Sequence, residues 1–291
     1  LRPFPGLIWQ GEDLSDKTIM ITREQGLGDD LRFSTCFHDI VAQAKHVIIE
    51  TDKRFVDLYK RTWPTATVRA ETGRSTGLLN YREDEVDFDL TAPAGMVAAR
   101  LRRSLAAFPR ECRPLIADAA KRQKARDWLD SLGAGPKIGL TWRSGLRTPL
   151  RNMLATEPVD WAPIQNIDGA ILINLQFGSP SDEIAEAAEK HGLVIHQMPD
   201  LDTHSDLDGT AALTAELDFV LGLWNAATEM AGSLGVPGVI YMPAHHSMQL
   251  GTGILPWHPS MRTYSVLPEF DRAGLVSHIA EDVRNLLPRK P

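Results

Sequence analysis

The sequence predicts an α/β protein with two domains, each a doubly wound parallel sheet covered by helices. Apolar strand-like runs alternate with helical patterns along nearly the whole chain, which is typical of βαβ units. The alternation restarts at "PKIGLTW" (136–142), and "KTIMITR" (17–23) is faintly echoed by "KIGLTWR" (137–143). A length of 291 residues also fits about two ordinary domains.

The elements of the first half follow a strand, helix, strand order. The spacing of apolar residues predicts short strands and amphipathic helices, with turn residues between them. The predicted elements are a strand over Thr18–Thr22, a helix over Asp29–Ala44, a strand over His46–Glu50, a helix near Lys53–Trp63, and short strands near Thr67 and Phe88.

The second half begins with a predicted helix over Ala119–Leu132, which Gly133 and Gly135 end. Strands are expected at 136–142, 170–176, 193–198, 217–223 and 238–242, with helices over Ser181–Lys190, Gly209–Glu216 and Ala226–Leu234. A last helix is expected over Asp271–Leu287. We therefore predict domains at 1–116 and 117–270, and a C-terminal helix within 271–291 that packs on either domain.

Composition excludes several classes of protein. The chain is 43% hydrophobic and 24% charged, as in ordinary soluble globular proteins. Its 31 basic and 38 acidic residues give a net charge of −7, which argues against a nucleic-acid partner, and the run Arg100, Arg102 and Arg103 is interpreted as a solvated helix face. No apolar run reaches the roughly 18 residues of a membrane span.

The cysteines and the start of the chain indicate its setting. Cys36 and Cys112 fit no metal-binding spacing, so we expect free thiols in a reducing compartment and a cytoplasmic location. The start, "LRPFPGLIWQ", has neither an initiating Met nor the apolar core of a signal peptide. We interpret "RPFPG" as the remnant of a linker in a longer polypeptide.

The stretch "ITREQGLGDDLRF" (21–33) runs from the first strand into the first helix. Gly26 and Gly28 suit a tight turn, because glycine reaches positive φ and allows close approach. The G-x-G-x-x-G fingerprint fails at Leu31, and the P-loop pattern is absent, so a Rossmann dehydrogenase is disfavoured. Asp29 or Asp30 is then either the N-cap of the helix or, for Asp29, a general base.

The chain resembles glycosyltransferases related to family 9, the heptosyltransferase-like enzymes, in the version that follows tetratricopeptide repeats. The resemblance rests on "WQGEDLSDKTIMITREQGLGD", "IGLTW" with "RNM", "TAALTAELDFVLGL" with "MAGSLGVPGVIYMP", and "PWHPSMRTYS". It implies the GT-B fold, in which two Rossmann-like domains face a cleft. It also implies a nucleotide-sugar donor mainly on the second domain, an acceptor on the first, and Asp29 as general base.

The donor side departs from the family pattern. The family's Asp-Thr, and the His four residues after that Thr, correspond to Trp224, Asn225 and Glu229. Asn225 and the nearby Thr228 offer donors to a diphosphate at the helix N-terminus, whereas Glu229 would repel it. Trp224 is either a stacking platform or a core residue.

The loop "RSGLRTPLRN" (143–152) adds Arg143, Arg147 and Arg151. A guanidinium suits phosphate oxygens, although solvated loop arginines are the alternative. Arg151 matches the family's Arg after this strand. We predict no metal and no cofactor beyond the nucleotide-sugar co-substrate. "DFD" (87–89) is interpreted as a strand edge, the pair His245–His246 as loop residues, and the pair Trp257–His258 as part of a rigid turn between prolines.

Three functions remain open at this point. The first is a metal-independent glycosyltransferase in which Asp29 deprotonates an acceptor hydroxyl, on a glycan or on a polypeptide presented by preceding repeats. The second is a catalytically degenerate GT-B module for binding or scaffolding, which the altered donor positions favour. The third, a nucleotide-sugar epimerase, would use the same paired domains.

Overall fold

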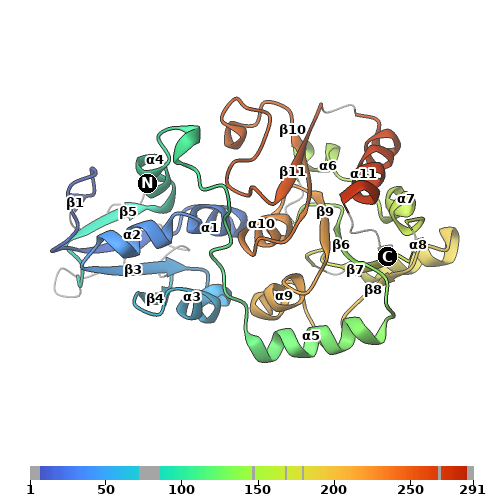
Figure 1. The fold of residues 1–291 in the computed structure, drawn as a ribbon, viewed down its shortest axis with the longest axis horizontal. Helices are drawn as coiled ribbons and strands as arrows, with labels where there is room; N and C mark the ends of the chain where they lie inside the picture. The colour runs from blue at the N-terminus through green and yellow to red at the C-terminus, as the bar shows by residue number, and fades with distance from the viewer. Residues whose placement is uncertain are drawn as a thin grey trace.

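The computed structural model describes residues 7–71, 86–145, 148–167, 169–178, 180–267 and 270–286. They form two parallel sheets with helices on their faces, so the predicted α/β fold with two doubly wound sheets is confirmed. Figure 1 shows the first sheet and its helices on the left, the second on the right, and α1 (Leu27–Ser34) beside α10 (Ala226–Ser233) where the halves meet.

The first sheet has the strand order β1-β5-β2-β3-β4, and every pairing in it is parallel. Ile19 and Ile21 of β2 face the large core, whereas Met20 between them packs with Ile48 and Phe88 on the other face. The strands are β1 (Leu7–Ile8), β2 (Thr18–Thr22), β3 (His46–Thr51), β4 (Thr67–Ala70) and β5 (Leu90–Pro93), and the helices besides α1 are α2 (Phe37–Gln43), α3 (Val56–Thr62) and α4 (Ala94–Leu101).

The single helix predicted over 29–44 is two helices, α1 and α2. The apolar stripe continues through both, because Leu31, Phe37 and Ile40 are all buried. Hydroxyl groups mark the break: Ser34 Oγ donates to the carbonyl of Leu31 at 2.7 Å, and Thr35 Oγ1 to that of Arg32 at 2.6 Å. Such bonds compete with the helical ladder, which the apolar spacing alone does not reveal.

The second sheet has the order β11-β10-β9-β6-β7-β8, again with parallel pairings. Its strands are β6 (Lys137–Thr141), β7 (Ile171–Asn174), β8 (Ile195–His196), β9 (Phe219–Leu223), β10 (Gly238–Pro243) and β11 (Met261–Val266). Its helices are α5 (Ala119–Ser131), α6 (Pro149–Met153), α7 (Ala162–Gln165), α8 (Ser181–His191), α9 (Leu207–Thr214), α10 and α11 (Arg272–Leu286).

The sequence pattern did not reveal β11. Only Met261 and Val266, at its two ends, are buried, and the four residues between them are half-buried or exposed. A strand at the edge of a sheet needs no continuous apolar run, so the periodicity is weak there.

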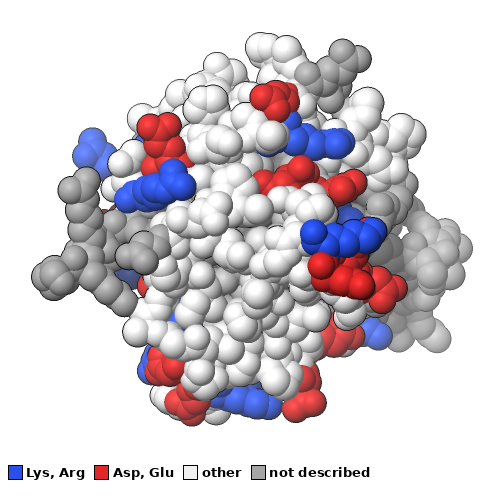
Figure 2. Space-filling model, turned by 90° about the vertical axis from the view of Figure 1, so that its right-hand side faces the viewer, with Lys and Arg blue, Asp and Glu red and all other residues white. Residues whose placement is uncertain are grey.

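Besides the small cluster of Met20, Ile48 and Phe88, two large apolar cores hold the chain together. The larger one includes residues of both halves, such as Leu31 of α1 and Met230 of α10. The smaller one covers the far face of the second sheet, where Val276 and Ile279 of α11 pack with Trp161. Figure 2, which looks onto this end of the molecule, shows basic and acidic side chains interspersed rather than gathered by sign.

Gly222 makes the contact between β9 and β6 possible, and its replacement by alanine should destabilise the fold. Its φ is +156°, and a Cβ here would lie 2.0 Å from the carbonyl oxygen of Thr141. The hydrogen-bonded backbones of β6 and β9 cannot move apart to relieve this clash. Gly222→Ala should therefore lower the free energy of unfolding, measured in urea, by about 3 kcal/mol. The control is Gly192→Ala, since Gly192 also has positive φ but nothing within 4 Å of the added carbon. Equal losses in the two variants would contradict the steric explanation.

Candidate active site

The carboxyl ends of the two sheets face one cleft. In each sheet the strand order reverses beside the first long strand, between β2 and β5 in one half and between β6 and β9 in the other. Ligands of doubly wound sheets bind outside the strand ends at such switch points. A cleft of about 580 Å³ lies there, lined by residues 25–29, Arg23, Arg32, Asp52, Arg54, Ser144, Gly145, Arg151, Phe177, His204, Trp224, Asn225, Ala226, Ala227 and Glu229.

Asp29 opens onto this cleft from the first turn of α1. Its carboxylate accepts a hydrogen bond from the backbone N–H of Gly26 at 3.1 Å and lies 3.2 Å from Nη1 of Arg32. The side chain keeps 29% of its surface exposed. Asp29 therefore supports the helix start and still presents a carboxylate oxygen to a ligand in the cleft.

Asp30 has a different position from Asp29. It is buried and accepts hydrogen bonds from Arg23 Nε at 2.7 Å, from Thr51 Oγ1 at 3.2 Å and from the backbone N–H of Asp52. Burial raises the pKa of the Asp30 carboxyl to about 7, although Arg23 opposes the shift. A group enclosed in this way cannot reach a substrate, so Asp29 is the better candidate for a base.

Neither aspartate is the N-cap, which is Gly26; Asp29 occupies the third helical position and bonds back to it. The expectation of positive φ at the two glycines is also wrong. Gly26 has φ −107°, and Gly28 lies within α1 without positive φ. Gly28 does allow the close approach that was also expected, since a Cβ there would lie 3.6 Å from Cγ of Glu229 and 3.9 Å from the backbone of Ala226.

The start of α10 forms the opposite wall. Asn225 is its N-cap: Oδ1 accepts from the backbone N–H groups of Ala227 and Thr228, and Nδ2 donates to Thr141 Oγ1 at 2.7 Å and to the Arg143 carbonyl at 3.2 Å. The Thr228 hydroxyl donates to the carbonyls of Leu223 and Asn225. Both side chains that we expected to contact phosphate are thus engaged within the protein. Ala226 also lines the cleft, and its backbone N–H has no hydrogen-bond partner among the described residues.

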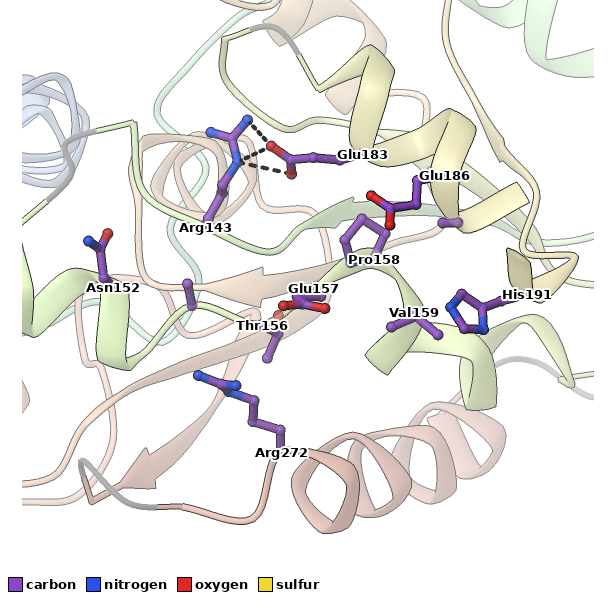
Figure 3. A pocket seen from close by; sticks show the side chains of 12 residues that line it. Arg143, Asn152, Thr156, Glu157, Pro158, Val159, Glu183, Glu186, His191 and Arg272 are labelled. Atoms are coloured by element: carbon purple, nitrogen blue, oxygen red, sulfur yellow. Dashed lines mark hydrogen bonds and ion pairs between the residues drawn. The ribbon is translucent and has the colours of Figure 1, made fainter. Parts of the chain in front are cut away.

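The three loop arginines are separated in the structure. Arg151 lines the cleft, and its Nη1 donates to Ser144 Oγ at 2.8 Å. No carboxylate of the described residues lies within ion-pair distance of it. Arg143 instead pairs with Glu183 in a second hollow of about 460 Å³, where Figure 3 shows the two side chains joined and Arg272 extending from the opposite side. Arg147 lies outside the described residues.

Glu229 does not face the cleft as a free charge. Its side chain is fully buried, and its oxygens accept hydrogen bonds from Arg32, from Trp224 Nε1 and, at 2.5 Å, from His258 Nε2. Burial alone would raise its pKa, but Arg32 and His258 outweigh burial and lower it from 4.5 to about 2. Glu229 is therefore an ionised member of a buried ionic cluster between α1 and α10.

Trp224 belongs to the same cluster. Its ring lies 5.0 Å from Cζ of Arg32 and 4.2 Å from the ring of His246, and the residue lines the cleft. Burial and the nearby Arg32 guanidinium lower the pKa of His246 below its usual value of 6.5. Sequence reasoning missed the role of Arg32, although the spacing of three residues between Asp29 and Arg32 was a readable signal. His258 was interpreted as part of a turn, and no sequence pattern indicated that its ring is buried against Glu229.

The sequence motifs set aside as metal sites are engaged in protein contacts. Asp87 pairs with Arg69 at 3.0 Å, and Asp89 accepts from the backbone N–H of Thr18 at 2.7 Å. The Nδ1 atom of His246 accepts from the backbone N–H of Met248. Within the part of the chain that the structure describes, no group of three or more His, Cys, Asp or Glu residues is placed to hold a metal ion. Metal independence of the chemistry stays a prediction.

Comparison with known proteins identifies the fold. No family model matches the chain. Protein FlbA of Caulobacter vibrioides is 36% identical over 269 residues, which are 89% of this chain but 45% of that protein, so the chain spans less than half of its length.

Solved structures with the same arrangement are glycosyltransferases. A glycosyl transferase family 9 protein from Veillonella parvula aligns with a TM-score of 0.66 at 13% identity, over 94% of this chain and 99% of that one. The ADP-heptose LPS heptosyltransferase II of E. coli gives 0.61 at 13% identity, over 92% and 96%. The E. coli heptosyltransferase WaaC with ADP-2-deoxy-2-fluoro heptose gives 0.56 at 12% identity, over 92% and 99%. The chain has the GT-B-like fold of these proteins.

No helix among the described residues is both long and apolar enough to cross a membrane.

Proposed function

We propose that the chain is a glycosyltransferase that moves a sugar from a nucleotide-sugar donor to an acceptor hydroxyl. One observation carries the proposal: Asp29, a partly exposed carboxylate, and Arg151, which has no carboxylate partner among the described residues, line the same cleft from opposite halves. Glycosyl transfer needs a base on the nucleophile and positive charge on the departing phosphate. The shared fold of the E. coli heptosyltransferases supports this assignment.

In the proposed reaction, Asp29 removes the proton from the acceptor hydroxyl. The hydroxyl oxygen then bonds to the anomeric carbon of the sugar as the bond from that carbon to the nucleotide diphosphate breaks. Arg151 and the backbone N–H of Ala226 at the start of α10 hold the departing diphosphate. The protein supplies this positive charge already in place, so little reorganisation is needed during transfer.

Nucleotide binding tests the donor side directly. A thermal-shift panel with ADP, UDP, GDP, CMP and their sugar conjugates should raise Tm by several degrees for one nucleotide family, because a ligand at a hundred times its Kd adds about 2.7 kcal/mol. ADP and ADP-heptose come first, since WaaC was solved with ADP and with an ADP-linked sugar.

Arg151→Met should weaken binding of that nucleotide about tenfold or more, because a charge-assisted bond to phosphate is lost. Arg272→Met is the matched control, since Arg272 belongs to the second half but lies in the other hollow. Isothermal titration calorimetry measures both variants. Equal effects in the two variants would remove Arg151 from the donor site.

A second function has a specific observation in its favour. The side chains of Asn225 and Thr228 at the start of α10 are engaged within the protein, which reduces the donors left for a diphosphate. A GT-B-fold module that binds or scaffolds without transfer would show this feature. A wild-type protein that melts cooperatively and responds to no nucleotide in the panel would favour the module over the enzyme.

A further inference from the structure

We propose that Glu229 is a positioning residue which, through Arg32, sets the orientation and the basicity of Asp29. The inference rests on the proposed function, in which Asp29 is the base. It assigns a purpose to the carboxylate at a position where diphosphate binding alone would disfavour a negative charge.

The contact runs through one guanidinium that serves two carboxylates. Arg32 Nε donates to Glu229 Oε1 at 3.0 Å, Nη2 contacts the same oxygen, and Nη1 lies 3.2 Å from Asp29 Oδ1. Only 1% of the Arg32 side chain and none of that of Glu229 is exposed, whereas Asp29 is 29% exposed. Arg32 and Asp29 are one turn apart on α1, so fixing the guanidinium fixes the direction from which Asp29 is held.

Glu229 is itself held from two further sides. His258 Nε2 bonds to its second oxygen at 2.5 Å, and Trp224 Nε1 donates to the first. Gly232 leaves the space for the imidazole, because a Cβ there would lie 2.3 Å from Cγ of His258. The orientation of Glu229 is therefore determined by the second half, and Arg32 transmits it to Asp29 on the first half.

Because Arg32 shares its charge between two carboxylates, the direction of the effect of Glu229 on Asp29 can be stated. The buried Glu229 takes two of the guanidinium contacts and Asp29 takes one. Neutralising Glu229 would leave the whole Arg32 charge to Asp29, which would favour the ionised form of the Asp29 side chain. The other charged or titratable groups near Asp29 are His246, which interacts with Asp29 and Arg32, and the cleft residues Arg23, Asp52, Arg54, Arg151 and His204.

The test measures Asp29 without any substrate. The carboxyl carbon of Asp29, assigned with an Asp29→Asn sample, is followed by 13C NMR through a pH titration of the wild-type chain and of two variants. Glu229→Gln should move the Asp29 midpoint down by about one pH unit. Arg32→Lys should move the Asp29 midpoint up. A lysine ammonium lacks the forked N–H groups that let arginine contact both carboxylates, and it should stay with the buried Glu229.

Ser233→Ala is the matched control. The Ser233 hydroxyl donates to the Leu31 carbonyl at 3.1 Å across the same α1–α10 contact but carries no charge. The Asp29 midpoint in the Ser233→Ala protein should therefore stay at the wild-type value. Opposite shifts in the two charge variants support the proposal. An unchanged midpoint in a cooperatively melting Glu229→Gln protein overturns it. If Glu229→Gln does not fold, the Arg32→Lys variant decides. A downward shift of the Asp29 midpoint in that variant, or no shift, would contradict the sharing of Arg32 between Glu229 and Asp29.

Nucleotide release from the nucleotide sugar that stabilises the wild-type protein most separates this inference from the function on which it rests. Opposite shifts of the Asp29 midpoint in a protein without transferase activity would support the link through Arg32 and contradict the proposed enzymatic function. Activity that depends on Asp29, together with midpoints that do not move, would keep the enzyme and reject the role of Glu229. In an active enzyme, Glu229→Gln should also lower kcat several-fold with KM unchanged, because a weaker base removes the proton more slowly.

Discussion

Asp29→Asn should lower the rate of sugar transfer by about 10²–10⁴-fold, the contribution of a positioned general base. Asparagine has nearly the same shape and can still accept from the backbone N–H of Gly26, as the carboxylate does at 3.1 Å, so the start of α1 should hold. Nucleotide affinity should stay at the wild-type value, because Arg151 and Ala226, the groups proposed to hold the diphosphate, belong to the second half. The measurement is nucleotide release from the nucleotide sugar that stabilises the wild-type protein most.

Asp52→Asn provides the control for this loss. Asp52 is another carboxylate of the same cleft, but its oxygens are bound to Arg54, with Nε at 2.8 Å. Its neutralisation changes the charge of the cleft by the same amount without removing the proposed base. Full turnover by Asp29→Asn, or equal losses in both variants, would show that Asp29 does not act as the base.

Glu229→Ala should cost about 3–5 kcal/mol of unfolding free energy, the usual effect of leaving one charge of a buried ion pair alone. Arg32 is 1% exposed and would keep Asp29 as its one ion-pair partner among the described residues. Adding Arg32→Met to that variant should recover much of the loss, since an apolar side chain in this place needs no partner. Urea unfolding of the two single variants and of the double variant measures the coupling energy.

Glu216→Ala is the reference for this stability effect. Glu216 accepts from Arg122 and Arg126, but both arginines are more than 40% exposed, so loss of this pair should cost about 1 kcal/mol or less. A Glu229→Ala loss no larger than that of Glu216→Ala would contradict a buried and paired charge. Additive losses of Arg32→Met and Glu229→Ala would mean that the two side chains do not interact.

The strands of both sheets were largely predictable from the sequence because their residues are buried on both faces. Thr18–Thr22 reads as a continuous apolar strand and is β2, and the strands at β6, β9 and β10 were located by the same signal. The edge strand β11 lacks that signal. The break between α1 and α2 depends on hydroxyl-to-carbonyl bonds of Ser34 and Thr35, which do not change the apolar spacing.

Less of the site could be predicted, because it depends on how the halves pack. Asp29 and Arg151 line the cleft. Both follow the carboxyl end of a strand, which is where ligand-binding residues lie in this fold. Arg143 pairs with Glu183 in the other hollow, which its place in the same loop did not indicate. The bond from Arg32 to Glu229 joins residues 197 positions apart, and only the contact of α1 with α10 brings them together.

The Arg32–Glu229 pair also limits how this protein can be recombined. A chimaera that joins the first half of this chain to the second half of a relative would place the Arg32 guanidinium against whatever stands at position 229. With a histidine or an apolar residue there, a buried cation would lose its main partner. Positions 32 and 229 must therefore be exchanged together in designed hybrids, although they lie in different halves and are remote in sequence.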